Sequence, residues 1–243
     1  MSGHSKWNTI KRAKGVADAK RGKIFTRHAK NIEIAARGGK DPTMNAILSA
    51  AIDVAKNDNL PKENIERAIK KGCGELVGNI TEEKQYEGYG PGGVAFLICA
   101  LTDNPNRTIA NVRHILSKHD GKIAESGSVA FQFKQHGLIT VENATDDNEL
   151  AAIDAGATET ECIEDILLVK TDPKNLMAVR KKLLDKGIVV KTAELVFEPT
   201  NEIKIKDANT ARKILQLVET LEEDEDVDSV ATNFDIPDEL LFE

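Results

Sequence analysis

The chain has 243 residues, of which 40% are hydrophobic and 30% charged, a composition that excludes disordered and fibrous proteins. Its apolar stretches fall far short of the roughly 20 residues that span a membrane, and no secretory leader is recognisable, so we expect a cytoplasmic protein without membrane contact. The formal net charge of -7, taken alone, argues against nucleic acid as a partner.

That charge is divided unevenly along the chain. Residues 1–71 hold 16 Lys and Arg against 7 Asp and Glu; of totals of 33 and 40, this leaves 17 against 33 for residues 72–243. The imbalance is steepest in residues 1–30, with nine cations and one acid. This segregation predicts a phosphate-binding N-terminal region and an anionic remainder that repels polyanions.

Residues 1–76 are predicted to form a basic arm followed by a three-helix bundle. Apolar residues recur at helical spacing over 22–37, and a second helix carries the apolar positions of Ile47–Ala55. Pro61 suits a first helical turn and Gly72 suits a position just after a helix, so a third helix is expected over 61–71.

Beyond residue 76, strands alternate with helices, which predicts two α+β domains. A discontinuous ferredoxin-like domain is expected from residues 77–135 and 200–243. Its predicted strands cover 94–102, 122–125, 128–133 and 227–234, and its helices cover 106–119 and 208–221.

The second α+β domain, residues 136–199, is predicted to be inserted into the first. Its strands are expected over 138–141, 166–169 and 189–197, and its helices over 149–155 and 173–184. The fold class is therefore α+β multidomain.

The first helix carries the clearest candidate binding surface. Its cations share one face at 100° per residue, opposite apolar positions such as Phe25 and Ile32. A stripe of one sign repels itself unless an anion neutralises it, which favours phosphate contact over a solvated face. With the preceding arm, the predicted nucleic-acid-binding residues are Lys6, Lys11, Arg12, Lys14, Lys20, Arg21, Lys23, Arg27 and Lys30.

A weaker set of candidate contacts lies elsewhere. Trp7 offers a stacking surface or a core residue, and His28 lies among cations that suit phosphate. The glycine-rich segment Glu87–Gly93 is either a tight turn or an exposed loop, and it is not a phosphate loop because it leads into a strand and lacks GK[ST]. The candidate secondary contacts are Trp7, Tyr86, Tyr89, Arg107, His114 and Lys118.

Catalytic and metal-binding patterns are not found. The sequence has no G-x-S-x-G or H-E-x-x-H motif, and its three cysteines are widely separated and not in CxxC spacing. The acidic run Glu219–Asp228 is expected to be solvent exposed or to repel polyanions. We therefore expect no enzyme activity, no catalytic residues, no metal and no cofactor.

Five segments in a fixed order give the chain a specific resemblance along essentially its whole length. It resembles the YebC/PmpR family of bacterial regulators, which also includes mitochondrial translational activators. That resemblance implies a helical domain and two α+β domains, and a probable transcriptional regulatory protein that binds DNA. The matching segments are Gly3–Trp7, Asp18–Phe25, Leu60–Gly72, Tyr86–Gly93 and Ser117–His119.

Two functions remain open from the sequence. The first is a non-enzymatic, DNA-binding transcriptional regulator; the alternative is a ribosome-associated translation factor that contacts rRNA. No helix-turn-helix and no base-reading set of Arg, Asn or Gln is evident, which favours recognition of backbone and shape. The sequence does not determine the oligomeric state and is compatible with a monomer.

Overall fold

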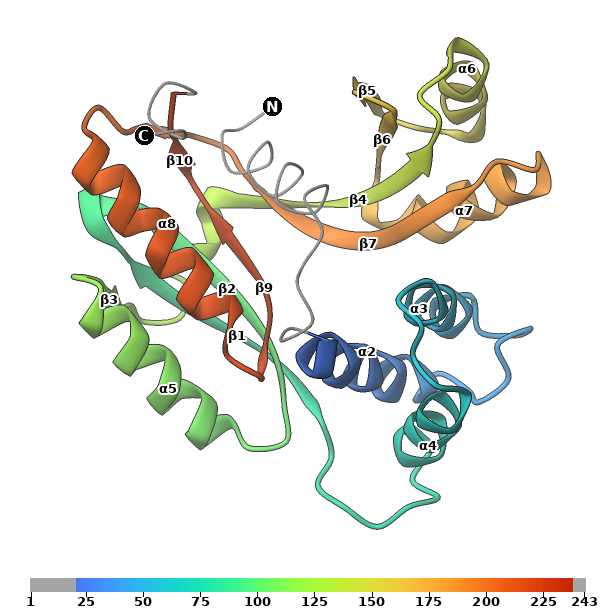
Figure 1. Cartoon of the computed structure of the whole chain (residues 1–243), viewed down its shortest axis with the longest axis horizontal. Helices are drawn as coiled ribbons and strands as arrows, with labels where there is room; N and C mark the ends of the chain where they lie inside the picture. The colour runs from blue at the N-terminus through green and yellow to red at the C-terminus, as the bar shows by residue number, and fades with distance from the viewer. Residues whose placement is uncertain (1–20, 238–243) are drawn as a thin grey trace.

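The computed structural model describes residues 21–237 (Figure 1). Its N-terminal part consists of helices α2 (Arg21–Ala36), α3 (Ala46–Asn57) and α4 (Lys62–Gly72), at the predicted places. Their apolar faces meet in one core that includes Ile32 and Leu48. The arm residues Lys6, Trp7, Lys11, Arg12, Lys14 and Lys20 lie outside the described residues.

Gly72 differs from its prediction, because it lies inside the last turn of α4 and not after it. A Cβ atom at this position would collide with the backbone carbonyl of Glu33 and with Ala36, both on α2. Glycine is therefore required for the close approach of α4 to α2. The left-handed residue that follows the helix is Gly74, with φ 76°.

A four-stranded antiparallel sheet lies at the centre of the second region. Its strands are β1 (Glu82–Tyr89), β2 (Ala95–Thr102), β3 (Lys122–Ile123) and β9 (Val227–Thr232), in the order β3-β1-β2-β9. Helices α5 (Pro105–Lys118) and α8 (Ala208–Glu222) lie side by side over one face (Figure 1). Because β1 pairs antiparallel with both neighbours, β2 and β3 run parallel on either side of it.

Two strand predictions fail in this sheet. Strand β1 was not predicted, because most of its residues are polar and its sequence shows little apolar periodicity. On the side that faces β3 only Gly88 and Tyr89 of β1 are paired, so the rest of that edge of β1 has no neighbouring strand and carries polar residues. The predicted strand over 128–133 is instead a loop and a short 3₁₀ helix, Ala130–Gln132. The predicted ferredoxin-like order of elements is accordingly replaced by a β1-β2-α5-β3 arrangement completed by α8 and β9.

The second sheet is also antiparallel, in the order β5-β6-β4-β7. Its core includes Ile139, Leu167 and Leu183. The predicted domain boundary between residues 135 and 136 falls inside β4. The elements of this region are β4 (Phe133–Glu142), α6 (Asp146–Ala155), β5 (Glu159–Ile163), β6 (Ile166–Thr171), α7 (Leu176–Asp185) and β7 (Val190–Pro199), of which β5 was not predicted.

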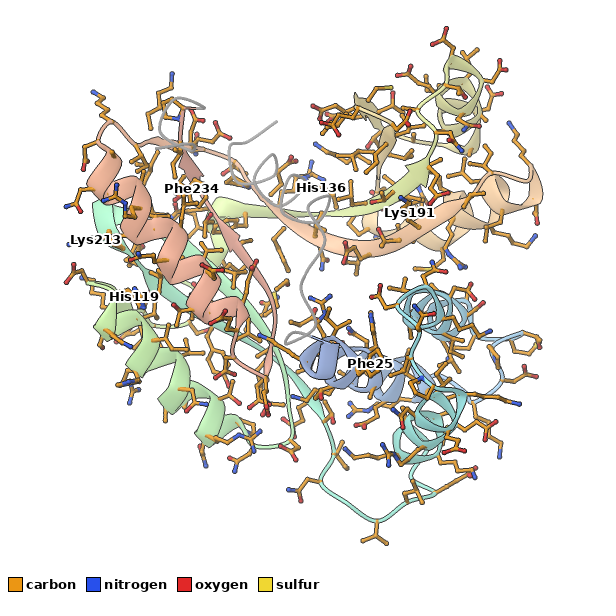
Figure 2. The ribbon with its side chains drawn as sticks, viewed as in Figure 1. Phe25, His119, His136, Lys191, Lys213 and Phe234 are labelled. Carbon is orange, nitrogen blue, oxygen red and sulfur yellow. The ribbon has the colours of Figure 1, made fainter. Side chains whose placement is uncertain are left out.

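Contacts on two sides hold the helical region in place. Arg180 on α7 donates to the carboxylate of Asp53 on α3. Asn57, at the end of α3, donates to the backbone carbonyl of Lys191 near the start of β7, where Figure 2 labels Lys191. On its other side, α2 meets the turn between α8 and β9 (Figure 1). The remaining short strands, β8 (Ile203–Lys204) and β10 (Phe234–Asp235), pair in parallel.

Strand β2 is buried on both faces, as its unbroken apolar sequence predicts. Phe96 and Ile98 pack under α5 and α8. Ala95 and Leu97 point to the opposite face, where Val129 from the loop after β3 covers them. The loop over residues 124–132 thus takes the place of a helical layer on that side of the sheet.

Candidate nucleic-acid interface

The basic face of α2 lies against an acidic segment of the same chain, which we define as Glu222–Asp228. Lys30 Nζ is 2.7 Å from Asp226 Oδ1 and donates to the Glu225 carbonyl oxygen at 2.8 Å. Asn31 Nδ2 donates to Asp228 Oδ1 at 3.2 Å. The contact is thus built from a cationic helix and an anionic turn (Figure 1).

Asp226 is the centre of this contact, and its side chain is 3% exposed. Besides Lys30, it accepts hydrogen bonds from Arg107 Nη2 at 2.8 Å and from Thr108 Oγ1 at 2.8 Å, both on α5. Burial acts to raise the pKa of Asp226, but the hydrogen bonds from Lys30, Arg107 and Thr108 outweigh it and lower the pKa to about 2. The carboxylate therefore stays ionised and joins α2 to α5.

Lys23 faces the same acidic segment without a direct bond to it. Its ammonium nitrogen is buried and has no hydrogen-bond partner within residues 21–237. Burial lowers the pKa of Lys23 to about 8; the nearby Asp224 acts to raise it and Arg27 to lower it further. Arg27 itself is half-buried, one helical turn further along α2.

The two-faced character of α2 follows the sequence. Phe25, Ala29, Ile32 and Ala36 pack into the helical core, and Figure 2 labels Phe25 on this helix. The opposite face of α2 lies against carboxylates of the same chain. The repulsion among the cations of this face is therefore not, by itself, a reason to expect a bound phosphate. Nucleic-acid binding by its residues stays a prediction, and for Arg21 the side chain is not described.

The acidic run Glu219–Asp228 was expected to be solvent exposed or to repel polyanions, and the structure corrects the expectation of exposure for Asp226. Asp226 is buried and bonded, and Asp224 Oδ2 accepts a hydrogen bond from Asn111 Nδ2 at 3.1 Å. The available signal was its place directly before Val227, where a buried strand begins. A carboxylate directly before a buried strand is itself buried, and a buried carboxylate needs hydrogen-bond donors or cations beside it.

The secondary contacts predicted from the sequence are used within the fold in three cases. The hydroxyl of Tyr86 donates to the Pro105 carbonyl at 3.3 Å, and that of Tyr89 to the Ser128 carbonyl at 3.0 Å. Arg107 is committed to Asp226 and Asp103.

His28, expected near phosphate, is instead 4% exposed, with its Nε2 2.5 Å from Asp58 Oδ2. Of the predicted secondary contacts within residues 21–237, His114 and Lys118 are exposed, and Arg107 is exposed as well although it pairs with Asp226 and Asp103.

The glycine-rich segment forms a tight turn. Strand β1 ends at Tyr89, and a single 3₁₀ turn over Pro91–Gly93 leads into β2. Gly92 and Gly93 have φ values of 70° and 75°, which residues with a Cβ atom rarely adopt. Of the two interpretations of this segment, the geometry therefore supports the tight turn.

Sequence reasoning missed a second buried carboxylate, Glu87. It is 6% exposed and accepts hydrogen bonds from the backbone N–H groups of Gly127, Val129 and Ala130 at 2.5 to 2.9 Å. Burial acts to raise the pKa of Glu87, but these three donors lower it below its ordinary value. Within residues 21–237, no group of three His, Cys, Asp or Glu side chains could hold a metal ion, and no helix is long and apolar enough to cross a membrane.

Comparisons with known proteins match the chain over nearly its full length. A model of the TACO1/YebC protein N-terminal domain matches residues 5–75, and a model of the TACO1/YebC second and third domain matches residues 81–234. A "probable transcriptional regulatory protein" from Halothermothrix orenii is 47% identical over 249 residues, covering 100% of this chain and 98% of its own. One of the same description from Desulfotalea psychrophila is 49% identical, covering 99% and 98%.

A solved structure supports the fold. The crystal structure of a conserved hypothetical protein from Aquifex aeolicus is similar, with a TM-score of 0.86 and 42% sequence identity. The match covers 93% of this chain and 95% of that one.

Proposed function

Because this chain belongs to the TACO1/YebC family, we propose that it is a nucleic-acid-binding transcriptional regulator that acts without catalysis. The observation that carries the proposal is the charge of residues 1–30, nine cations against one acid, in a chain whose net charge is -7. Its relatives named probable transcriptional regulatory proteins support the regulatory role. A cytoplasmic location is part of the same proposal.

The acidic segment divides the cations of this region into two groups. Lys23 and Lys30 face Asp224 and Asp226, so a phosphate at these positions would meet carboxylates as well as ammonium groups. Arg27 makes no ion pair with a carboxylate within residues 21–237, and the cations before α2 lie outside the described residues. We therefore assign phosphate contact mainly to Lys6, Lys11, Arg12, Lys14, Lys20 and Arg27.

Recognition of this kind is electrostatic and reads the backbone. Each phosphate neutralised by a lysine or arginine releases condensed counterions, so the logarithm of the binding constant falls with the logarithm of salt concentration by ~0.9 per contact on duplex DNA. Such contacts position a protein on its target, and sequence preference then depends on base-edge or shape readout.

The experiment measures binding to duplex DNA by fluorescence anisotropy at a series of salt concentrations. Arg27→Ala should reduce the salt slope by ~0.9, and the combined Lys6→Ala, Lys11→Ala, Arg12→Ala variant by ~2.7. Lys181→Ala is the matched control, because Lys181 is an exposed cation paired with Asp185 on α7. Unchanged slopes in both test variants would remove the N-terminal region from the proposal.

The alternative target, rRNA, is separated by crosslinking in cells and sequencing of the bound nucleic acid. Recovery mainly of promoter DNA supports a transcriptional regulator. Recovery mainly of rRNA contradicts it and assigns the protein to translation.

A further inference from the structure

The anionic remainder of the chain contains one region of the opposite charge. Two stretches, residues 113–122 and 204–213, together hold seven Lys and Arg against two Asp and Glu. Because residues 72–243 hold 17 against 33, all the other residues of that part hold 10 against 31. The cations of these stretches, which we call the α5–α8 basic patch, are Arg113, Lys118, Lys122, Lys204, Lys206, Arg212 and Lys213.

Folding brings the two stretches together at one end of the layer formed by α5 and α8. The first stretch covers the second half of α5 and reaches β3, and the second leads from β8 into α8. The two helices lie side by side, and Lys213 Nζ is 2.6 Å from Asp120 Oδ2 across them. Figure 2 labels Lys213 and His119 at this end of the two helices. Six of the seven cations are exposed, and Lys213 is half-buried.

Local structure does not account for this gathering of cations. Both carboxylates of the two stretches are already engaged, because Asp120 pairs with Lys213 and Asp207 caps α8. The dipole of α5 favours Lys118 in its last turn for any function, but the dipole of α8 disfavours a cation such as Lys206 directly before its cap. The cations therefore repel one another with little compensation from the fold.

The basic patch is concave. It borders an open pocket of about 480 Å³ at the end of the central sheet, and Lys122 is one of the residues that line it. The glycine-rich turn forms one wall through Tyr89, Gly90 and Gly93, and the α5–β3 loop forms another through Asp120 and Gly121.

We propose that the α5–α8 basic patch is a second contact surface for the phosphate backbone of the bound nucleic acid. The inference rests on the proposed function and adds to it a contact outside the N-terminal region. A duplex carries one charge per ~1.7 Å, so its backbone neutralises several of these cations at once. The two stretches, which the structure describes in full, hold no exposed large apolar side chain, whereas the centre of a protein interface is apolar.

The position of α5 allows one duplex to reach both surfaces. Helix α5 begins beside α2, because Asp226 bonds to both Lys30 and Arg107, and it ends at the basic patch. Its 14 residues cover about 20 Å, the length of about six base pairs. No Asp or Glu occurs in α5, whereas α8 ends in the acidic segment Glu222–Asp228. A backbone that follows α5 thus meets no carboxylate of that helix between the two surfaces.

The test measures the salt dependence of binding of the full chain to a DNA duplex of ~18 base pairs, three times the span of α5, and to an RNA duplex of the same sequence. The combined Lys118→Ala, Lys122→Ala, Arg212→Ala variant should reduce the salt slope on DNA by ~2.7, since each side chain neutralises one phosphate. The conservative variant Lys118→Arg, Lys122→Arg, Arg212→Lys should keep the wild-type slope. The matched control, Lys174→Ala, Lys181→Ala, Lys186→Ala, removes three exposed cations in and beside α7 and changes the net charge equally.

The outcomes separate this inference from the function it rests on. A slope reduced on one duplex alone supports the patch and identifies DNA or RNA as the source of the phosphates. An unchanged slope in the patch variant, with the slope still reduced in the Lys6, Lys11 and Arg12 variant, overturns the second surface and leaves the proposed function in place. An equal loss in the α7 control overturns it as well, since net charge alone would then explain the effect. Failure of the wild-type chain to bind either duplex overturns both.

Discussion

Replacing Asp226 with asparagine tests the contact between the acidic segment and the two helices that bind it. The substitution keeps the size of the side chain and removes the charge that Lys30 and Arg107 share. Lowering the pKa of Asp226 from 3.8 to about 2 corresponds to about 2 kcal/mol of stabilisation by the ionised form, at ~1.4 kcal/mol per pKa unit. For a chain of this size, a loss of that amount should lower the melting temperature by about 4–8 °C.

The pH dependence provides the sign of the effect. The folded pKa lies below the unfolded one, so the stabilisation is fully present above pH 4 and is lost as the pH falls through about 2. The difference in melting temperature between wild type and Asp226→Asn should therefore be constant at neutral pH and shrink below pH 4. Differential scanning calorimetry at several pH values measures it.

Asp103→Asn is the matched control, because it makes the same chemical change at another carboxylate that pairs with Arg107. The Asp103 side chain is 37% exposed, whereas that of Asp226 is 3% exposed. An exposed pair contributes about 0.5 kcal/mol, so this variant should melt within about 2 °C of wild type. If the two variants lose equal stability, burial of the Asp226 contact does not matter and the reasoning is refuted.

Three further predictions concern other buried groups. Glu87→Gln should lower the free energy of unfolding by about 1–3 kcal/mol in urea titrations at pH 7, and, because the folded pKa of Glu87 is lowered, the wild-type advantage should disappear as the pH falls below the ordinary glutamate range. Gly72→Ala should cost about 1–3 kcal/mol by forcing α4 from α2, whereas Gly78→Ala, which has only the Lys71 side chain nearby, should be nearly neutral in thermal melts. Lys23→Met should remove the gain in stability that wild type shows between pH 8 and 10.5, since the lowered pKa of Lys23 makes the unfolded chain bind the extra proton there; a parallel pH profile for both proteins would contradict this.

Local patterns in the sequence were sufficient for much of the fold. Helical spacing of apolar residues located α2, α3 and α4, and an unbroken apolar run identified β2 as doubly buried. Strand β1 was missed because most of its residues are polar, and the 128–133 segment was predicted as a strand because its sequence places Val129, Phe131 and Phe133 at every second position. The structure buries Val129 and Phe133 but exposes Phe131, because this segment is a loop anchored by the Glu87 carboxylate and not a strand with one buried face.

The sequence by itself determined that the cations gather at the N-terminus and that they share one face of the first helix. Only the tertiary structure decided what that face meets: Asp226 lies 196 residues beyond Lys30, and the ion pair forms because the α8–β9 turn is folded back onto α2. A charge count gives the sign of each region, whereas the partner of each charge depends on which distant segments the cores bring together. For the same reason Glu87 was visible in the sequence as one acid among glycines, while its three N–H partners came from a loop some 40 residues away.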